Sequence, residues 1–598
     1  MPRLLSSIPP VAILLFLTTL AHAQSPTALR YLAEWCDGSR SSAAEIADWS
    51  WVDKQPRMLD RPLYDPGNRI RWLRDTTLEA PLPSPAVIEF IGGDMLPGKV
   101  VGYRSSVALP DSPVPSHLLV EPSVSLDRPG TAPRPLLRIV PQWVRRVIWE
   151  RRPHDRFSPG TVFCRDGRQM HYRSLRWHES SVRLLMTDGT QQLAFEEIAE
   201  LHLPPADDWE SLASQRVCLS PTAASLLMTI ESIFGLKATT SLERFEARSI
   251  GKEGEPNNWL HAFQPSWSLD GLYVYHRQIR HRQFFAAHEV PLTAITPVRM
   301  AHRAAFAAGW KNARTNQSVF GGPLIGAGEP FAWGYGVHAH HELEFDLSPA
   351  ARTFRTRLAL DPSVGGGGCV RVMVYHGSTE GEPLYESPPL VGSQKVIDTG
   401  RMALAPTIQG RSRLICVADA LIDDAPAGSD PLDIRDALNW LEPMIELNPD
   451  EAYKSITARW LEALPALAGW KVDRPYLDDW RIQHTSYATS FAPVVNIGGT
   501  RWQLQRKFAI DSNQSALAIR VSHPDRRSTS GLLRVLVDGQ KVHEGPIPVT
   551  VDPASVKPLT LPLNAEPGRE VEVTLQFELN GASMTLDWRG AAIVSLMP

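Results

Sequence analysis

The run VHAHHE at residues 337–342 is the densest group of metal-binding side-chain types in the chain. Alternate residues of a β-strand share a face, so a strand here would bring His338, His340 and Glu342 together. Imidazole and carboxylate groups are ligands for several transition metals. A metal site needs a further ligand, which the run does not supply. We therefore favour the alternative that His338 is a packed or hydrogen-bonded strand residue, with His340 and Glu342 beside it on the surface.

Motifs for the common catalytic mechanisms are absent from the sequence. We find no G-x-S-x-G nucleophile elbow, no H-E-x-x-H zinc motif, no phosphate-binding loop and no Rossmann glycine fingerprint. A glycosidase needs two facing carboxylates, one of them with a raised pKa. Adjacent acidic residues on a strand point to opposite faces, which excludes a facing pair at three places: Asp423 and Asp424, Glu196 and Glu197, and Asp478 and Asp479. We therefore predict that the chain is not an enzyme, with a glycoside hydrolase as the alternative.

Aromatic and polar side chains gather close to the histidine run. A pyranose offers a C–H face that stacks on an aromatic ring and hydroxyls that bond to charged or planar polar groups. Trp310, Trp333 and Tyr335 supply rings beside His338 and His340, and these five residues are our candidates for carbohydrate binding. Aromatic residues at strand positions also build cores, and for Trp333 and Tyr335 both interpretations stay open.

The segment that positions these residues consists of short alternating runs bounded by Gly, Pro or Asp, which is typical of sandwich strands. Five motifs follow one another in it: GYGVHA at 334–339, FDL at 345–347, LD at 360–361, VRVMVYHG at 370–377 and a closing strand with Trp440. In this order the segment, roughly residues 310–446, resembles the NPCBM domain, a family of carbohydrate-binding modules. The resemblance implies a jelly-roll sandwich with a carbohydrate partner, and the best-studied ligands of the family are galactose-containing glycans.

The remaining chain is long enough for several domains. Two stretches about 75 residues apart repeat a strand, a Gly/Asp turn and further strands, which indicates small repeated β modules. We predict an all-β, multidomain fold, with small β-barrel or β-roll repeats followed by two jelly-roll (galactose-binding-like) β-sandwiches. The expected boundaries are 1–23 signal peptide, 24–84 lead-in and linker, 85–155 and 156–210 β-barrel-like repeats, 211–304 third β-rich unit, 305–446 NPCBM-like sandwich and 447–598 C-terminal sandwich.

The N-terminus indicates export. Arg3 is followed by an apolar run at 11–17 and by Ala21-His22-Ala23, the features of a secretory signal peptide with its cleavage site. The apolar run is shorter than the roughly 20 residues that a membrane span needs. We expect a secreted, periplasmic or cell-surface bacterial protein with no transmembrane segment after cleavage. The motifs before residue 300 also resemble exported proteins of planctomycete-type bacteria, which implies architecture and not chemistry.

The net charge bears on the kind of partner, and the cysteine content bears on disulfide bonds. A net charge of −4 gives no electrostatic reason to expect nucleic acid. The five cysteines are scattered, and Cys369 and Cys416 are expected either to pair or to be two buried thiols. We expect no cofactor. The alternative is a structural calcium with contributions from Asp361, Asp430, Asp433 and Asp436.

These observations together predict a secreted, non-catalytic protein that recognises cell-surface or environmental polysaccharide through its NPCBM-like segment. Two alternatives stay open. The first is a glycan-active hydrolase with its catalytic module upstream, and the second is a structural or adhesion protein of the cell envelope. The oligomeric state and the glycan are not predicted.

Overall fold

A computed structural model describes residues 29–48, 55–106, 115–129, 133–150, 157–204, 207–219, 226–242, 246–249, 259–303, 312–405, 412–452, 470–473, 481–483, 494–497, 501–522, 531–549, 556–579 and 586–595. Antiparallel strands dominate this part of the chain. The predicted signal peptide lies outside the described residues. Where the structure describes helices, none is long and apolar enough to cross a membrane.

Four successive segments of the N-terminal body repeat one arrangement of strands. In each, the first strand pairs antiparallel with the second across a tight turn and also with the last. In that order the strands are β1 (Tyr31–Trp35), β2 (Arg40–Ala43) and β5 (Ile70–Asp75); β6 (Val87–Phe90), β7 (Met95–Arg104) and β10 (Val144–Ile148); β11 (Thr161–Cys164), β12 (Gln169–His171) and β16 (Ile198–His202); β17 (Leu226–Ser232), β18 (Lys237–Ser241) and β22 (Ile279–Ala286).

The same turn joins the first two strands of every repeat. Its glycine, Gly38, Gly93, Gly167 or Gly235, has a φ between 83° and 92°, and its N–H donates to the carbonyl three residues earlier. Glycine adopts this left-handed conformation at little cost, which explains the Gly/Asp signal in the sequence. The structure also shows a repeat that the sequence analysis did not predict, formed by β1, β2 and β5 inside the expected lead-in. A Pro- and Arg-rich stretch follows its turn and conceals the pattern.

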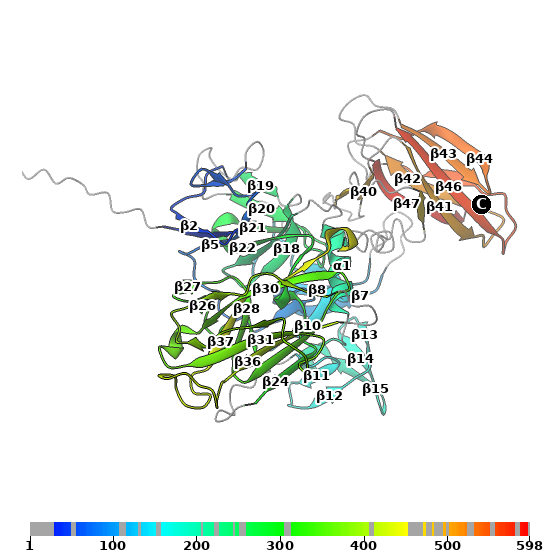
Figure 1. Cartoon of the computed structure of the whole chain (residues 1–598). Helices are drawn as coiled ribbons and strands as arrows, with labels where there is room; N and C mark the ends of the chain where they lie inside the picture. Colours follow the sequence, from blue (N-terminus) through cyan, green and yellow to red (C-terminus); the bar gives the residue numbers. More distant parts are fainter. Residues whose placement is uncertain are drawn as a thin grey trace, which may run out of the picture.

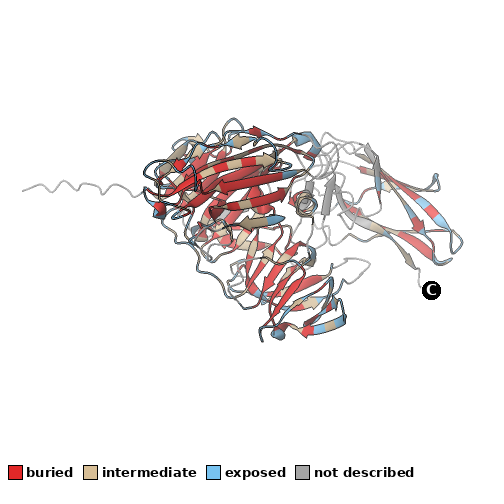
Figure 2. Cartoon of the chain, turned by 60° about the horizontal axis from the view of Figure 1, so that its bottom comes forward, coloured by how far each residue is buried: buried red, intermediate tan, exposed pale blue. Residues whose placement is uncertain are grey.

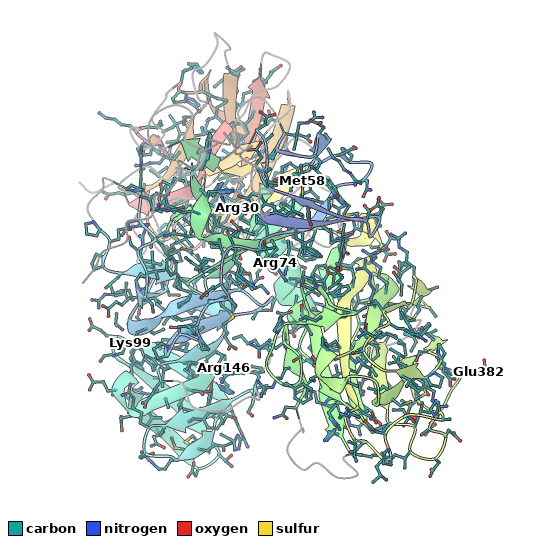
Figure 3. All side chains as sticks on the ribbon, turned by 90° about the vertical axis from the view of Figure 1, so that its left-hand side faces the viewer. Arg30, Met58, Arg74, Lys99, Arg146 and Glu382 are labelled. Atoms are coloured by element: carbon teal, nitrogen blue, oxygen red, sulfur yellow. The ribbon has the colours of Figure 1, made fainter. Side chains whose placement is uncertain are left out.

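The last strands join the repeats in pairs. Strands β10 and β16 pair around Val147 opposite Leu201, and β22 and β5 pair around Arg282 opposite Leu73. Figure 3 labels one residue at each junction, Arg146 on β10 and Arg74 on β5. Strands β7 and β18 connect the two pairs of repeats, which gives one 14-stranded sheet in the order β12-β11-β16-β10-β6-β7-β18-β17-β22-β5-β1-β2, with β8 (His117–Pro122) beside β7 and β9 (Leu137–Ile139) beside β8. The sequence pattern separates the repeats but does not show that their edges pair.

The next unit is a β-sandwich, shown in green to yellow in Figure 1. One sheet contains β25 (Arg314–Thr315), β28 (Gly334–His338), β37 (Ala437–Leu447), β30 (Ala351–Leu360), β34 (Ile397–Asp398), β35 (Met402–Ala403) and β23 (Glu289–Pro291). The other contains β24 (Arg299–His302), β29 (His341–Asp346), β36 (Arg413–Asp419), β31 (Cys369–His376), β32 (Tyr385–Glu386) and β33 (Leu390–Val391). Alternating Val, Leu and Phe side chains fill the core between the sheets, and Trp440 lies in it. Cys369 and Cys416 are free buried thiols.

A second sandwich follows with its own core. Its first sheet orders β38 (Lys471–Asp473), β41 (Arg501–Ala509), β46 (Glu570–Leu579), β43 (Gly531–Val537) and β44 (Gln540–Pro546). Its second orders β39 (Arg481–Gln483), β40 (Val494–Ile497), β47 (Leu586–Ser595), β42 (Ser515–Ser522) and β45 (Leu559–Pro562). The predicted fold class, an all-β chain with two sandwiches after a repeat region, is confirmed.

The first sandwich shares buried structure with the repeat body. Strand β23 leaves the body directly after β22 and pairs with β37 of the sandwich. Trp72 on β5 packs in one apolar cluster with Trp333 and Met444. Its indole N–H donates to the Glu442 carboxylate over 2.7 Å. Figure 2 shows buried residues running through both parts. The sandwich is therefore one face of a larger packed unit.

Candidate functional site

The two predicted sugar-stacking aromatics that the structure describes are buried. Trp333 is 2% exposed, its ring packs edge-on against Phe285 at 5.2 Å, and its indole N–H donates to the carbonyl of Pro443 over 3.2 Å. Tyr335 is also 2% exposed, and its hydroxyl donates to the carbonyl of Leu292 over 3.1 Å. Neither ring has a free face for a sugar, so the core interpretation holds for both. Trp310 lies outside the described residues.

The convergence of His338, His340 and Glu342 on one strand face, the alternative that the sequence analysis disfavoured, is not formed by the chain. Strand β28 ends at His338, and β29 begins at His341 in the opposite sheet. The alternation that would align the three side chains is therefore interrupted. His338 is buried, with its Nδ1 atom 2.8 Å from the Ala339 carbonyl oxygen. Within the described ranges, no group of three or more His, Cys, Asp or Glu residues has the arrangement of a metal site.

His340 alone of the described candidates reaches solvent, at the margin of the sheet β24-β29-β36-β31-β32. This sheet turns Val372, Val374 and other apolar residues inward. The strand period of two therefore turns the intervening residues outward. In the middle of the outer face the register places Tyr375 opposite Ile415 and Met373 opposite Val417. Tyr375 and Met373 are partly exposed, so an aromatic ring and a thioether form a short apolar strip on the surface.

Charged groups border this strip on one side. The Nη2 atom of Arg371 donates to Asp419 Oδ2 over 3.0 Å, and Arg371 Nη1 lies 3.6 Å from Glu386. His340 joins the same group, with Nδ1 3.4 Å from Asp419 Oδ1 and Nε2 3.3 Å from Glu342 Oε1. Planar donors and acceptors therefore stand in a row beside the apolar strip. We call the strip and this row the outer-face site.

The electrostatics of the row favour the charged forms. The hydrogen bond to Asp419, and then that to Glu342, raises the pKa of the His340 imidazole against the lowering effect of burial. The hydrogen bonds from His340 and Arg371 lower the pKa of Asp419. Both side chains are partly exposed, so water and salt screen their attraction. The row is a pre-arranged set of hydrogen-bonding groups and contributes little stability.

The opposite border of the strip is also charged. Glu344 faces Arg299 across β24 and β29 at 3.8 Å, and Arg413 forms a close ion pair with Glu344. The site is thus apolar in the middle and polar on both sides, which is the composition that a sugar ring with its hydroxyl edge requires. The sequence analysis missed Arg371, Met373 and Tyr375. Their signal was the alternation of VRVMVYH, in which the buried Val370, Val372 and Val374 alternate with the partly exposed Arg371, Met373 and Tyr375.

A second group of polar side chains lies between the repeat body and the sandwich. Arg357 bridges Glu34 of β1 at 2.8 Å and Glu442 of β37 at 3.5 Å. Burial, and then the charge of Glu34, raises the pKa of Glu442 to about 7. The cavity beside them holds only about 20 Å³, which is room for about one water molecule. A glycosidase needs space for a sugar between its two carboxylates, so this pair does not form such a site.

Comparison with known proteins finds a family match over part of the first sandwich. Residues 297–405 match the NPCBM/NEW2 domain, which confirms the resemblance drawn from the motifs and covers about a fifth of the chain. This match supports carbohydrate binding as the class of function. Strands β24, β29 and β31 lie within the matched range, whereas β36 with Asp419 lies beyond it.

Other comparisons are weaker. No curated protein matches the chain. Among solved structures, the chain is similar to the CBM51 module of a Clostridium perfringens GH95 protein in complex with methyl-galactose, with 19% identity over 26% of this chain and 99% of that one and a TM-score of 0.21. It is also similar to the CBM51-2 and INT domains of Clostridium perfringens ZmpB in complex with GlcNAc, with 17% identity over 35% of this chain and 43% of that one and a TM-score of 0.22. At these TM-scores the two structures carry no argument about this chain.

Proposed function

We propose that the protein binds a glycan on the outer face of the sheet β24-β29-β36-β31-β32. The observation that carries the proposal is the partly exposed Tyr375 and Met373 strip next to the hydrogen-bonding row of Arg371, Asp419 and His340. A pyranose ring lies on the strip in this proposal, and its hydroxyls bond to the row. The match to the NPCBM/NEW2 domain supports it.

The proposal includes a non-catalytic role and export from a bacterial cell. In the Glu34 and Glu442 pair the pKa of Glu442 is raised to about 7, and the pair lies beside a cavity too small for a sugar. Galactose-containing glycans are the first ligands to test. The proposed binding requires no cofactor, so addition of EDTA leaves the affinity unchanged, whereas a structural calcium would make the affinity depend on it.

A glycan array of the purified full chain tests the proposal. The full chain is required because the sandwich shares a buried cluster with the repeat body. Tyr375→Ala and Arg371→Ala should each lower the affinity for a bound glycan about tenfold or more, since each removes a direct contact. Arg401→Ala is the matched control. It removes an arginine whose partner is Glu446 of the other sheet, at 3.1 Å, and it should leave binding unchanged.

Two outcomes would contradict the proposal. The first is a complete lack of binding on an array that contains neutral and acidic glycans. The second is glycan binding that Tyr375→Ala and Arg371→Ala leave intact, because the site would then lie elsewhere. A thermal unfolding curve for each variant separates lost contacts from lost folding.

A further inference from the structure

A small sheet on the repeat body carries positive charge without carboxylate partners. It consists of β13 (Ser174–His178), β14 (Ser181–Met186) and β15 (Gly189–Ala194), labelled at the lower right of Figure 1. Its inner face is anchored, because Val182, Leu184 and Leu193 belong to the core of the body. Leu175 and Trp177 pack against the same core. The opposite face is therefore held in a fixed orientation.

The strand register places two arginines side by side on this outer face. Arg176 lies directly opposite Arg183, and Arg183 lies opposite Gln192. All three side chains are exposed. Like charges directly opposite each other in an antiparallel pair repel. The pairing of Arg176 with Arg183 therefore destabilises the folded protein when no ligand is bound.

Neither arginine is neutralised by a carboxylate within the part of the chain that the structure describes. The contact of Arg183 is with the Gln192 amide oxygen, 3.4 Å from its Nη2 atom, and Arg176 has no ion pair. The nearby exposed Arg104, in contrast, pairs with Glu179. Apart from the contact of Arg183 Nη2 with Gln192, the guanidinium donors of Arg176 and Arg183 are available to a ligand. We call them the arginine pair.

We propose that the arginine pair binds the sulfate or carboxylate groups of an acidic polysaccharide. A guanidinium is a planar fork of N–H donors that fits two oxygens of such a group, and one anion between two guanidinium groups removes their repulsion. The choice of a polysaccharide rests on the proposed glycan-binding function. Nucleic acid is disfavoured, because the chain has a net charge of −4 and the outer face of this sheet presents no Phe, Tyr or Trp for base stacking.

The test compares dextran sulfate, carboxymethyl dextran and plain dextran as ligands for the full chain at low salt. The double variant Arg176→Gln and Arg183→Gln should lower the affinity for the sulfated or the carboxylated polymer about tenfold or more. The control is the double variant Arg104→Gln and Arg168→Gln. It removes the same total charge from two exposed, ion-paired arginines of the same body and should change the affinity less than about twofold.

Three outcomes would overturn the proposal. The first is that neither charged polymer binds. The second is an equal loss of affinity in both double variants. The third is equally tight binding of single-stranded DNA, which would indicate a general polyanion surface. The polymer that binds more tightly identifies the preferred group. Tyr375→Ala distinguishes this proposal from the preceding one. It should remove neutral glycan binding and preserve dextran sulfate binding, whereas the arginine variants should do the reverse.

Discussion

Replacement of Glu442 by glutamine should stabilise the protein at pH 8 and have little effect below pH 5. Glu442 is 8% exposed and receives hydrogen bonds from the Trp72 indole and, at 3.3 Å, from the Ala332 backbone N–H. Burial is the largest cause of its raised pKa. The negative charge of Glu34 adds to it, and Arg357 and Arg40 act against it.

The sign follows from the two states of the protein. In the unfolded chain the Glu442 carboxyl loses its proton near pH 4.5, whereas in the folded chain it keeps the proton up to about pH 7. Folding therefore becomes less favourable as the pH rises from 4.5 to 7, and the full cost is present above pH 7. At about 1.4 kcal/mol for each pKa unit the cost is about 3 kcal/mol. This figure already includes the attraction to Arg357, because the pKa reflects the balance of all these effects.

Thermal unfolding from pH 5 to 8 measures the effect. Glutamine keeps an oxygen that accepts from Trp72 and carries no charge, so Glu442→Gln removes the cost. For a cooperative unit of roughly 420 residues, about 3 kcal/mol corresponds to a rise in Tm of about 3 °C at pH 8. Glu329→Gln is the control, since Glu329 is exposed and contacts Arg40 of the same region at 3.3 Å. A lower Tm for Glu442→Gln at pH 8, or the same difference from the native protein at pH 5 and pH 8, would refute the reasoning.

Three further predictions concern the core, the turns and the outer-face site. Trp333→Ala should lower the free energy of unfolding by about 3–5 kcal/mol in a denaturant titration, yet leave glycan affinity unchanged below its Tm, because the ring is buried. Gly93→Ala should cost about 1–2 kcal/mol, since its φ is 91° and no atom within 3.5 Å would block the added methyl; an unchanged midpoint would contradict the turn geometry. Glycan affinity should fall as the pH rises past the raised pKa of His340, because the neutral ring donates from one nitrogen only. Calorimetric titrations across this range should show no such fall for His340→Gln.

The fold could be predicted from the sequence better than the site. The reason is that the sequence patterns of strands and turns are local, whereas the contacts that form the site are not. Alternation and Gly/Asp turns are local, so the sandwich strands and the repeat turns could be recognised. The pairing of Val147 with Leu201 is not local, because it depends on which strand edges meet. The all-β class was therefore predictable, and the continuous sheet was not.

The site was difficult to predict for a related reason. An aromatic residue on a strand can face the core or solvent, and the residue type does not distinguish the two. Trp333 faces a neighbouring body that the sequence pattern did not reveal, whereas Tyr375 is partly exposed on the outer face, next to the inward-facing Val374. Whether each ring is buried or exposed depends on how the sheets pack against their neighbours. His340 was found because its imidazole belongs to a conspicuous run.

A structure of the full chain with a bound glycan from the array tests the central claim most directly. The account predicts a sugar ring over Tyr375 and Met373, with hydroxyls within about 3 Å of Arg371 and Asp419. A sugar bound to the opposite sheet, or to the C-terminal sandwich, with the Tyr375 face empty would contradict it.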